Sequence, residues 1–315
     1  MHYSRSMDLP LRIRQAALLS ALLLPLVFAS CEESDLLYVL NPDGSGRVTN
    51  REKILTSQFE ITGAAALEEV ALSTLAEFLV RSRGVDAWEK ASYTLTESGD
   101  VIVEVTALFP DLAKLELATT ASTLPLAAGL RFDPGAEGRP ASIQLRSPIL
   151  SVPQQKKPEG PLPDADEIAS ELAKTRSNWE QAEQNIRPSF GNKRSKVTFH
   201  LPGEISASHN FKKDAKNQVS IEVTAPKMLD TLEKVIVDDQ LAKEILKTGA
   251  KIMANEGAPP IKPDTFNRLS FGEAKPIRVE YQPGGMIFDY QGAVEAAKAN
   301  PSELLELARK RIETP

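Results

Sequence analysis

Residues 36–54 read LLYVLNPDGSGRVTNREKI, and this stretch decides the fold class at the start of the chain. The run 36–40 contains no breaker and is typical of a buried β-strand. Residues 41–46 then concentrate the residue types that form turns. The chain continues to Ile54 in a segment that is extended or helical. The pattern favours a β-hairpin whose glycines adopt positive φ in the turn.

The next 100 residues alternate helix and strand patterns. Residues 64–82 predict a helix, because apolar side chains recur along one face at i, i+4, i+8 and i+11. These positions are Leu67, Ala71, Leu75, Phe78 and Leu79. Extended segments are predicted at 92–97, 101–108, 129–133 and 141–146.

The second half repeats this mixture. Helices are predicted at 164–184, 226–254, 293–299 and 302–312, and strands at 196–201 and 218–223. The helical stretch 226–254 is expected to break at Asp238-Asp239, where an acidic side chain can cap a new helix. A late hairpin is predicted from strands at 277–281 and 286–290 around the turn 283–285.

Five prolines between residues 148 and 164 mark the best candidate for a linker. Proline at this density fixes φ and removes backbone donors, so neither helix nor sheet continues. The sequence therefore predicts an α+β protein with antiparallel sheets and packed helices, in two parts joined by this linker. The predicted parts are an N-terminal domain at 31–147 and a C-terminal domain at 165–315.

The first 30 residues are typical of an export signal. Arg5, Arg12 and Arg14 supply positive charge, and residues 16–29 follow as fourteen residues without charge. This run is shorter than the roughly 20 apolar residues that a membrane-spanning helix needs. It fits the apolar region of a cleaved signal peptide.

Cys31, the single cysteine of the chain, ends this segment. The string VFASC at 27–31 resembles the lipobox of bacterial lipoproteins, where the signal is cut before a cysteine that carries lipid. Ala29 and Ser30 match that pattern, whereas Phe28 stands where an aliphatic residue is usual. The resemblance implies acylation of Cys31 and anchoring to the inner or outer membrane of a bacterial envelope. The alternative is cleavage after Ala29, which leaves a secreted protein with a free thiol.

Two further stretches resemble envelope lipoproteins. The stretch Leu40–Val48, with its turn at 43–46 soon after the lipobox, is similar to uncharacterised bacterial lipoproteins. The string VTFHLPG at 197–203, followed by the strand 219–223, weakly resembles the folded domain of mycobacterial envelope lipoproteins of the LppM type. This resemblance implies a cell-envelope protein of unassigned activity, and Cys31 is the only functional residue that it transfers.

Residues 41–52 also resemble the calcium-binding loop of EF-hands. The oxygen ligands would come from Asn41, Asp43, Ser45 and Glu52. A hard cation needs several oxygens, and a distant bidentate glutamate closes its coordination shell. The asparagine at the first ligand position, Pro42 at the loop entry and the strand-like residues before the loop depart from the family. A plain hairpin turn is the preferred interpretation, and a weak calcium site is the alternative.

No other motif predicts chemistry. The chain has no phosphate loop, dinucleotide fingerprint or nucleophile elbow, so we expect no enzyme and no cofactor. His200 and His209 lack the spacing of a helical zinc pair. A net charge of −6 argues against a dedicated nucleic-acid binder. Basic residues gather at 193–196 and 212–216, where contact with anionic head groups is the one function we retain.

The apolar faces at 67–79 and 228–253 are predicted to pack on the sheets as core. A lipid-binding groove between helix and sheet would use the same side chains. The sequence thus predicts a lipid-anchored envelope protein that is a non-enzymatic binding or structural module. Its partners are expected to be the membrane, through Cys31, and an envelope protein or lipid, with no nucleic acid. A module that binds lipid or a small ligand in a helix–sheet groove is the alternative.

Overall fold

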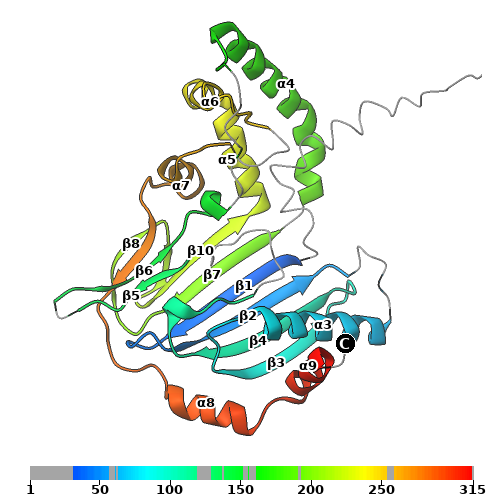
Figure 1. Ribbon diagram of the computed structural model, residues 1–315, viewed down its shortest axis with the longest axis vertical. Helices are drawn as coiled ribbons and strands as arrows, with labels where there is room; N and C mark the ends of the chain where they lie inside the picture. The colour runs from blue at the N-terminus through cyan, green and yellow to red at the C-terminus, as the bar shows by residue number, and fades with distance from the viewer. Residues whose placement is uncertain are drawn as a thin grey trace, which may run out of the picture.

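The computed structural model describes residues 31–56, 61, 63–118, 129–136, 138–151, 155, 161–190, 193–253 and 259–313 (Figure 1). The predicted signal peptide at 1–30 lies outside these ranges. Helices and strands alternate along the described chain, which confirms the predicted α+β class.

A large sheet of seven strands has the order β3-β4-β2-β1-β7-β10-β9. The strands are β1 Cys31–Leu40, β2 Gly46–Ile54, β3 Ala87–Leu95, β4 Val101–Phe109, β7 Arg194–His200, β9 Lys212–Ala215 and β10 Gln218–Thr224. All neighbouring strands are antiparallel except β1 and β7, which are parallel. Parallel neighbours need a long crossover connection, and here most of the chain between Leu40 and Arg194 supplies it.

A small sheet of four strands has the order β5-β6-β11-β8 and is entirely antiparallel. Its strands are β5 Arg131–Asp133, β6 Ala141–Leu145, β8 Ile205–His209 and β11 Ile277–Tyr281. Both sheets therefore take strands from each side of the predicted linker. The segments 31–147 and 165–315, predicted as two domains, do not form separate sheets. Sequence spacing could not reveal this, because the pairs β1–β7 and β6–β11 join residues far apart in the chain.

The two faces of the large sheet differ in chemistry because side chains alternate along each strand. One face, which we call the core face, is buried and carries mainly apolar side chains. Its side chains include Leu36, Tyr38 and Leu40 of β1, Val48 of β2, Val103 and Val105 of β4, and Val197 and Phe199 of β7. The opposite face, which we call the polar face, carries the alternate residues of the same strands. Leu37, on the polar face, is 40% exposed.

The helices lie around the sheets in two groups and one separate helix (Figure 1). Their bounds are α3 Ala64–Arg81, α4 Ala165–Phe190, α5 Ala225–Val237, α6 Asp239–Leu246, α7 Pro263–Phe271, α8 Tyr290–Ala299 and α9 Glu303–Glu313. Helices α3 and α9 pack on each other and on β3. Helices α4, α6 and α7 each pack on α5, which follows β10 directly. Short 3-10 turns lie at Leu112–Lys114 and Pro148–Ser151.

Helix α8 packs on the face of the large sheet that is opposite to the face covered by α3. Tyr290, Val294 and Ala297 of α8 form a small buried cluster with Ala87 and Leu108. Leu108 points away from the core face, because its neighbours Ala107 and Phe109 belong to the core that includes α3. The polar face is therefore covered by α8 at its β3–β4 corner.

Several predicted helices are confirmed. Helix α3 buries Leu67, Ala71, Leu75 and Phe78, as the periodicity requires. The predicted break at Asp238-Asp239 separates α5 from α6, and the Asp238 carboxylate accepts a bond from the backbone N–H of Leu241 at 3.0 Å. Helix α4 extends to Phe190, beyond the predicted end at 184.

The predicted late hairpin is wrong in its second strand. Residues 277–281 form β11, but β11 pairs with β6 and β8, and residues 286–289 form no strand. The glycines after β11 allow a close approach between two backbones, since the N–H of Gly284 donates to the carbonyl of Pro202 at 2.6 Å. Asp289 then begins a helix by accepting a bond from the N–H of Gly292. Strands β8 and β9 and helix α7 were not predicted from the sequence.

Candidate functional site

The turn between β1 and β2 is held by its own polar groups. The Asn41 N–H donates to the carbonyl of Ser45 at 2.8 Å, and the Gly44 N–H donates to the carbonyl of Asn41 at 3.1 Å. The Asp43 carboxylate accepts from the Ser45 N–H at 3.0 Å and from its hydroxyl at 2.7 Å. Gly44 has φ of 87°, a conformation that favours glycine. The register of β1 against β2 confirms the predicted hairpin.

The Asn41 side chain joins this turn to a segment 246 residues away in sequence. Its Oδ1 accepts from the backbone N–H groups of Ile287 and Phe288 at 3.0 and 3.4 Å. Its Nδ2 donates to the Phe288 carbonyl at 3.3 Å and to the Ser45 hydroxyl at 3.2 Å. Asn41 is 0% exposed. The amide therefore satisfies backbone groups that burial would otherwise leave without partners.

Aromatic and charged side chains strengthen the same junction. The guanidinium carbon of Arg47 lies 4.1 Å from the centroid of the Phe288 ring, and Arg47 also pairs with Glu89 at 3.4 Å. The Tyr290 hydroxyl donates to the Asp86 carboxylate at 2.9 Å. We call this end of the large sheet, with the turn 41–45 and residues 286–290, the Asn41 end.

Glu52 lies far from the turn. It belongs to β2, is 0% exposed, and faces Ser34 of β1 and Val103 of β4 on the core face. Asn50 donates to its carboxylate at 3.1 Å. Glu52 is six residues beyond Gly46, which is about 20 Å along a strand at roughly 3.3 Å per residue.

The structure thus brings together three of the four candidate calcium ligands and separates the fourth. Asn41, Asp43 and Ser45 share the turn, but their oxygens bond to one another or to residues 287–288. A calcium loop needs its closing glutamate in the same coordination shell, and a hairpin strand carries Glu52 away from it. Within the described ranges, no group of three or more His, Cys, Asp or Glu side chains could hold a metal ion.

The opposite end of β1 is held by charges. Arg194, the first residue of β7, contacts Asp35 at 2.8 Å, Glu33 at 3.1 Å and Glu222 at 3.4 Å. Arg51 adds a longer contact to Asp35 at 3.7 Å. Burial of the Arg194 guanidinium acts to lower its pKa, but the charges of the three carboxylates outweigh this and raise the pKa above its usual value. These side chains lie on the polar face, close to Cys31 in the chain.

Cys31 is the first residue of β1, and its backbone is aligned with Ile54, the last residue of β2. The strand is longer than the predicted run 36–40 by five residues at its start. Charged residues such as Glu33 and Asp35 hid this extension from a pattern based on apolar residues. Among the helices that the structure describes, none combines the length and the apolar character needed to cross a membrane.

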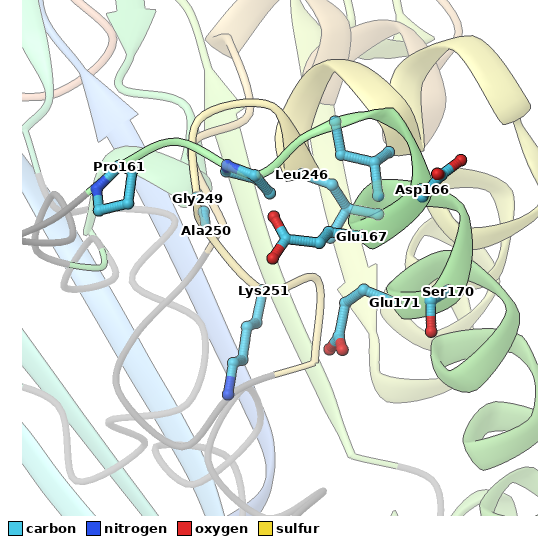
Figure 2. A pocket seen from close by; sticks show the side chains of 11 residues that line it. Pro161, Asp166, Glu167, Ser170, Glu171, Leu246, Gly249, Ala250 and Lys251 are labelled. Carbon is cyan, nitrogen blue, oxygen red and sulfur yellow. The ribbon is translucent and has the colours of Figure 1, made fainter.

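An open cleft of about 630 Å³ lies at the start of α4 (Figure 2). It is lined by residues of two segments, Pro161, Pro163, Asp166, Glu167, Ile168, Ser170 and Glu171 on one side and Leu246, Gly249, Ala250 and Lys251 on the other. Figure 2 shows the carboxylates of Glu167 and Glu171 and the amine of Lys251 at its border. Glu167 also has a structural role, because it accepts the Asp164 N–H at 3.0 Å while Asp164 caps the helix.

The other candidate side chains lie apart from one another. His209 pairs with Glu273 at 3.0 Å, whereas His200 ends β7. Phe199 and Phe211, which stand between the basic residues in sequence, are buried, and the Phe199 ring stacks on Tyr38 with centroids 5.0 Å apart. These rings are therefore core side chains and offer no stacking surface for nucleic-acid bases.

Comparison of the chain with models of protein families, with curated proteins and with solved structures gives no match. The resemblance to envelope lipoproteins therefore stays a prediction from the sequence.

Sequence reasoning missed the role of Asn41 and the network of Arg194. The signal for Asn41 was present, because an asparagine before Pro-Asp-Gly that ends a strand is well placed for local bonds. Its distant partners could not be recognised from the sequence, because Asn41 bonds to backbone groups of residues 287–288, which are the same whatever side chains these residues carry. Arg194 meets Glu33 and Asp35 only because β1 and β7 are neighbours in the sheet.

Proposed function

We propose that this chain is a bacterial envelope lipoprotein, anchored through lipid on Cys31, whose folded part is a non-enzymatic binding or structural module. The observation that carries the proposal is the position of Cys31. The export-type segment of the sequence ends at this residue, and Cys31 itself belongs to β1. A lipid on Cys31 would therefore attach directly to a strand of the large sheet.

The polar face of the large sheet is the surface that we assign to an envelope partner. Antiparallel sheets commonly have one face on the core and one in water. Here the polar face mixes ion pairs, such as Arg194 with Asp35, with hydroxyl groups, such as Thr49 and Thr106, whose oxygens lie 3.0 Å apart. A rigid surface of this kind supports binding or a structural role, and the proposal names no catalytic residue.

Intact mass of protein extracted from a bacterial membrane fraction tests the anchor. We expect a polypeptide that begins at Cys31 and carries the mass of at least two acyl chains, because stable anchoring takes more than one acyl chain. The Cys31→Ala variant should lose this mass and leave the membrane fraction. An unacylated chain that begins at Ser30 and is recovered from the soluble fraction would contradict the proposal.

A second candidate function is small-ligand binding in the cleft at the start of α4. Its volume of about 630 Å³ lies within the roughly 300–1,000 Å³ that is usual for ligand sites. The apolar helix faces that a helix–sheet groove would use are instead buried in the core, including Leu75, Phe78, Leu229 and Ile236.

Thermal unfolding in the presence of a panel of cationic and zwitterionic small molecules tests the cleft. A ligand that binds only the folded state raises Tm. A true cleft ligand should lose its effect in Glu171→Gln and keep it in Glu180→Gln, an exposed position on the same helix. If both variants respond like the wild type, the ligand binds elsewhere and this candidate is wrong.

A further inference from the structure

The chain between Cys31 and the folded body is too short to act as a tether. Residues 31–35 belong to β1, and the Arg194 guanidinium holds both Glu33 and Asp35. Only residues 31 and 32 precede these contacts, and two extended residues span about 7 Å at most. A lipid on Cys31 would therefore bring the body of the protein to the membrane surface.

We propose that one particular end of the large sheet lies against the bilayer, and this inference rests on the acylation proposed above. We call it the Cys31 end. It is defined by a row of aligned residues in four neighbouring strands, Cys31 of β1, Ile54 of β2, Val101 of β4 and Leu95 of β3. The turn at 96–100 joins β3 to β4 beside this row.

The side chains at the Cys31 end fit an interface with lipid head groups. Leu95 is exposed although it is a large apolar residue, and the first turn of α3 exposes Ala64, Ala65 and Ala66. Glu97 in the turn is also exposed and would remain in the hydrated head-group layer. The acyl chains supply the affinity, and this small surface sets the orientation.

The Asn41 end would then project away from the membrane. The nine steps of β1 from Cys31 to Leu40 correspond to about 30 Å at roughly 3.3 Å per residue. Residues 287 and 288 are bonded to Asn41, so Met286, which directly precedes them and is 56% exposed, marks this distal end. The polar face would stand upright on the membrane and stay open to a partner from the side.

Short-range quenching in reconstituted vesicles tests the orientation. Cys31 is the only cysteine, and acylation blocks its thiol, so Glu97→Cys and Met286→Cys each offer one free thiol for a small fluorophore. The full lipoprotein is placed in phosphatidylcholine–phosphatidylethanolamine vesicles that contain a lipid with a nitroxide on its head group. We expect most of the fluorescence to be quenched at position 97 and almost none at position 286.

A tether variant and a flotation assay separate the possible failures. A Gly-Ser insertion after Glu32 gives the body a flexible linker, and the contrast between the two labels should then disappear. If the protein without the insertion floats with the vesicles but its labels at positions 97 and 286 are quenched equally, the proposed orientation is wrong and the anchor stands. Protein that does not float would overturn both the anchor and the orientation.

Discussion

The two ends of β1 are secured by different physical means. At the Asn41 end, a neutral and fully buried amide makes hydrogen bonds to the backbone of residues 287–288. At the Cys31 end, Arg194 makes ion pairs with Glu33, Asp35 and Glu222, all of them partly exposed to water. The Asn41 end closes the core, whereas the ion pairs at the Cys31 end join β1, β7 and β10 on the polar face.

This difference has energetic consequences. A buried polar group that loses its partner costs its full desolvation free energy, and salt does not change that cost much. Partly exposed ion pairs contribute less, because water screens them and ordering long side chains costs entropy. The Asn41 end should therefore control the stability of the fold, whereas the Cys31 end can vary with ionic conditions.

The substitution Asn41→Ala should have the largest effect. It removes the partner of two backbone N–H groups and one carbonyl, and we expect a loss of about 2–4 kcal/mol in the free energy of unfolding. Urea unfolding followed by circular dichroism measures this loss. Asn300→Ala, at an exposed position after α8, is the control and should change stability by less than about 0.5 kcal/mol. An equal effect of the two substitutions would contradict the role of Asn41.

The next largest losses of stability should come from substituting one turn glycine at each end of the large sheet. Gly44 and Gly99 have similar positive φ values, 87° and 83°, so alanine strains the backbone equally at both. A Cβ on Gly44 would also lie 2.7 Å from Cε1 of Phe132, whereas a Cβ on Gly99 meets nothing within 4 Å. We expect Gly99→Ala to cost about 1 kcal/mol and Gly44→Ala about 1–2 kcal/mol more. Equal losses in urea unfolding would show that Phe132 moves aside freely.

Substitution of the central arginine tests the Cys31 end. Arg194→Met should reduce the free energy of unfolding by about 1 kcal/mol at low salt, and the difference from the wild type should shrink at high salt. Lys213→Met is the control, because Lys213 is exposed on β9 of the same sheet and forms no ion pair within the described part of the chain. A loss for Arg194→Met that is independent of salt would show that packing, and not charge, is the important contribution.

Local features of the fold were predictable from the sequence. The helix face from Leu67 to Phe78, the break before Asp239 and the turn after Leu40 each depend on neighbouring residues. Periodicity, capping and turn chemistry report such features directly. The hairpin predicted at residues 41–46 depends on the same local signals and is confirmed.

The features that failed all depend on distant partners. The second strand of the late hairpin is absent because residues 287–288 bond to Asn41, and the two predicted parts share the large sheet because β7 pairs with β1. Loop length and local composition carry no information on such pairs. Of the candidate site residues, Cys31 is proposed from the sequence alone, whereas the Arg194 network requires knowledge of the strand order.

Calcium should produce the smallest effect. Asp43 and Ser45 already bond to each other, and Glu52 lies about 20 Å from them along β2, so millimolar calcium should leave Tm unchanged. Thermal unfolding with calcium and with chelator measures this, and magnesium at the same concentration controls for ionic strength. Glu52→Gln alters a buried hydrogen bond with Asn50 and should change Tm by itself, so the relevant quantity is the calcium-dependent shift within each variant. A shift in the wild type that Glu52→Gln abolishes would mean that β2 bends to bring Glu52 back to the turn. That outcome would make the Asn41 end a ligand-controlled junction rather than the fixed closure of the core.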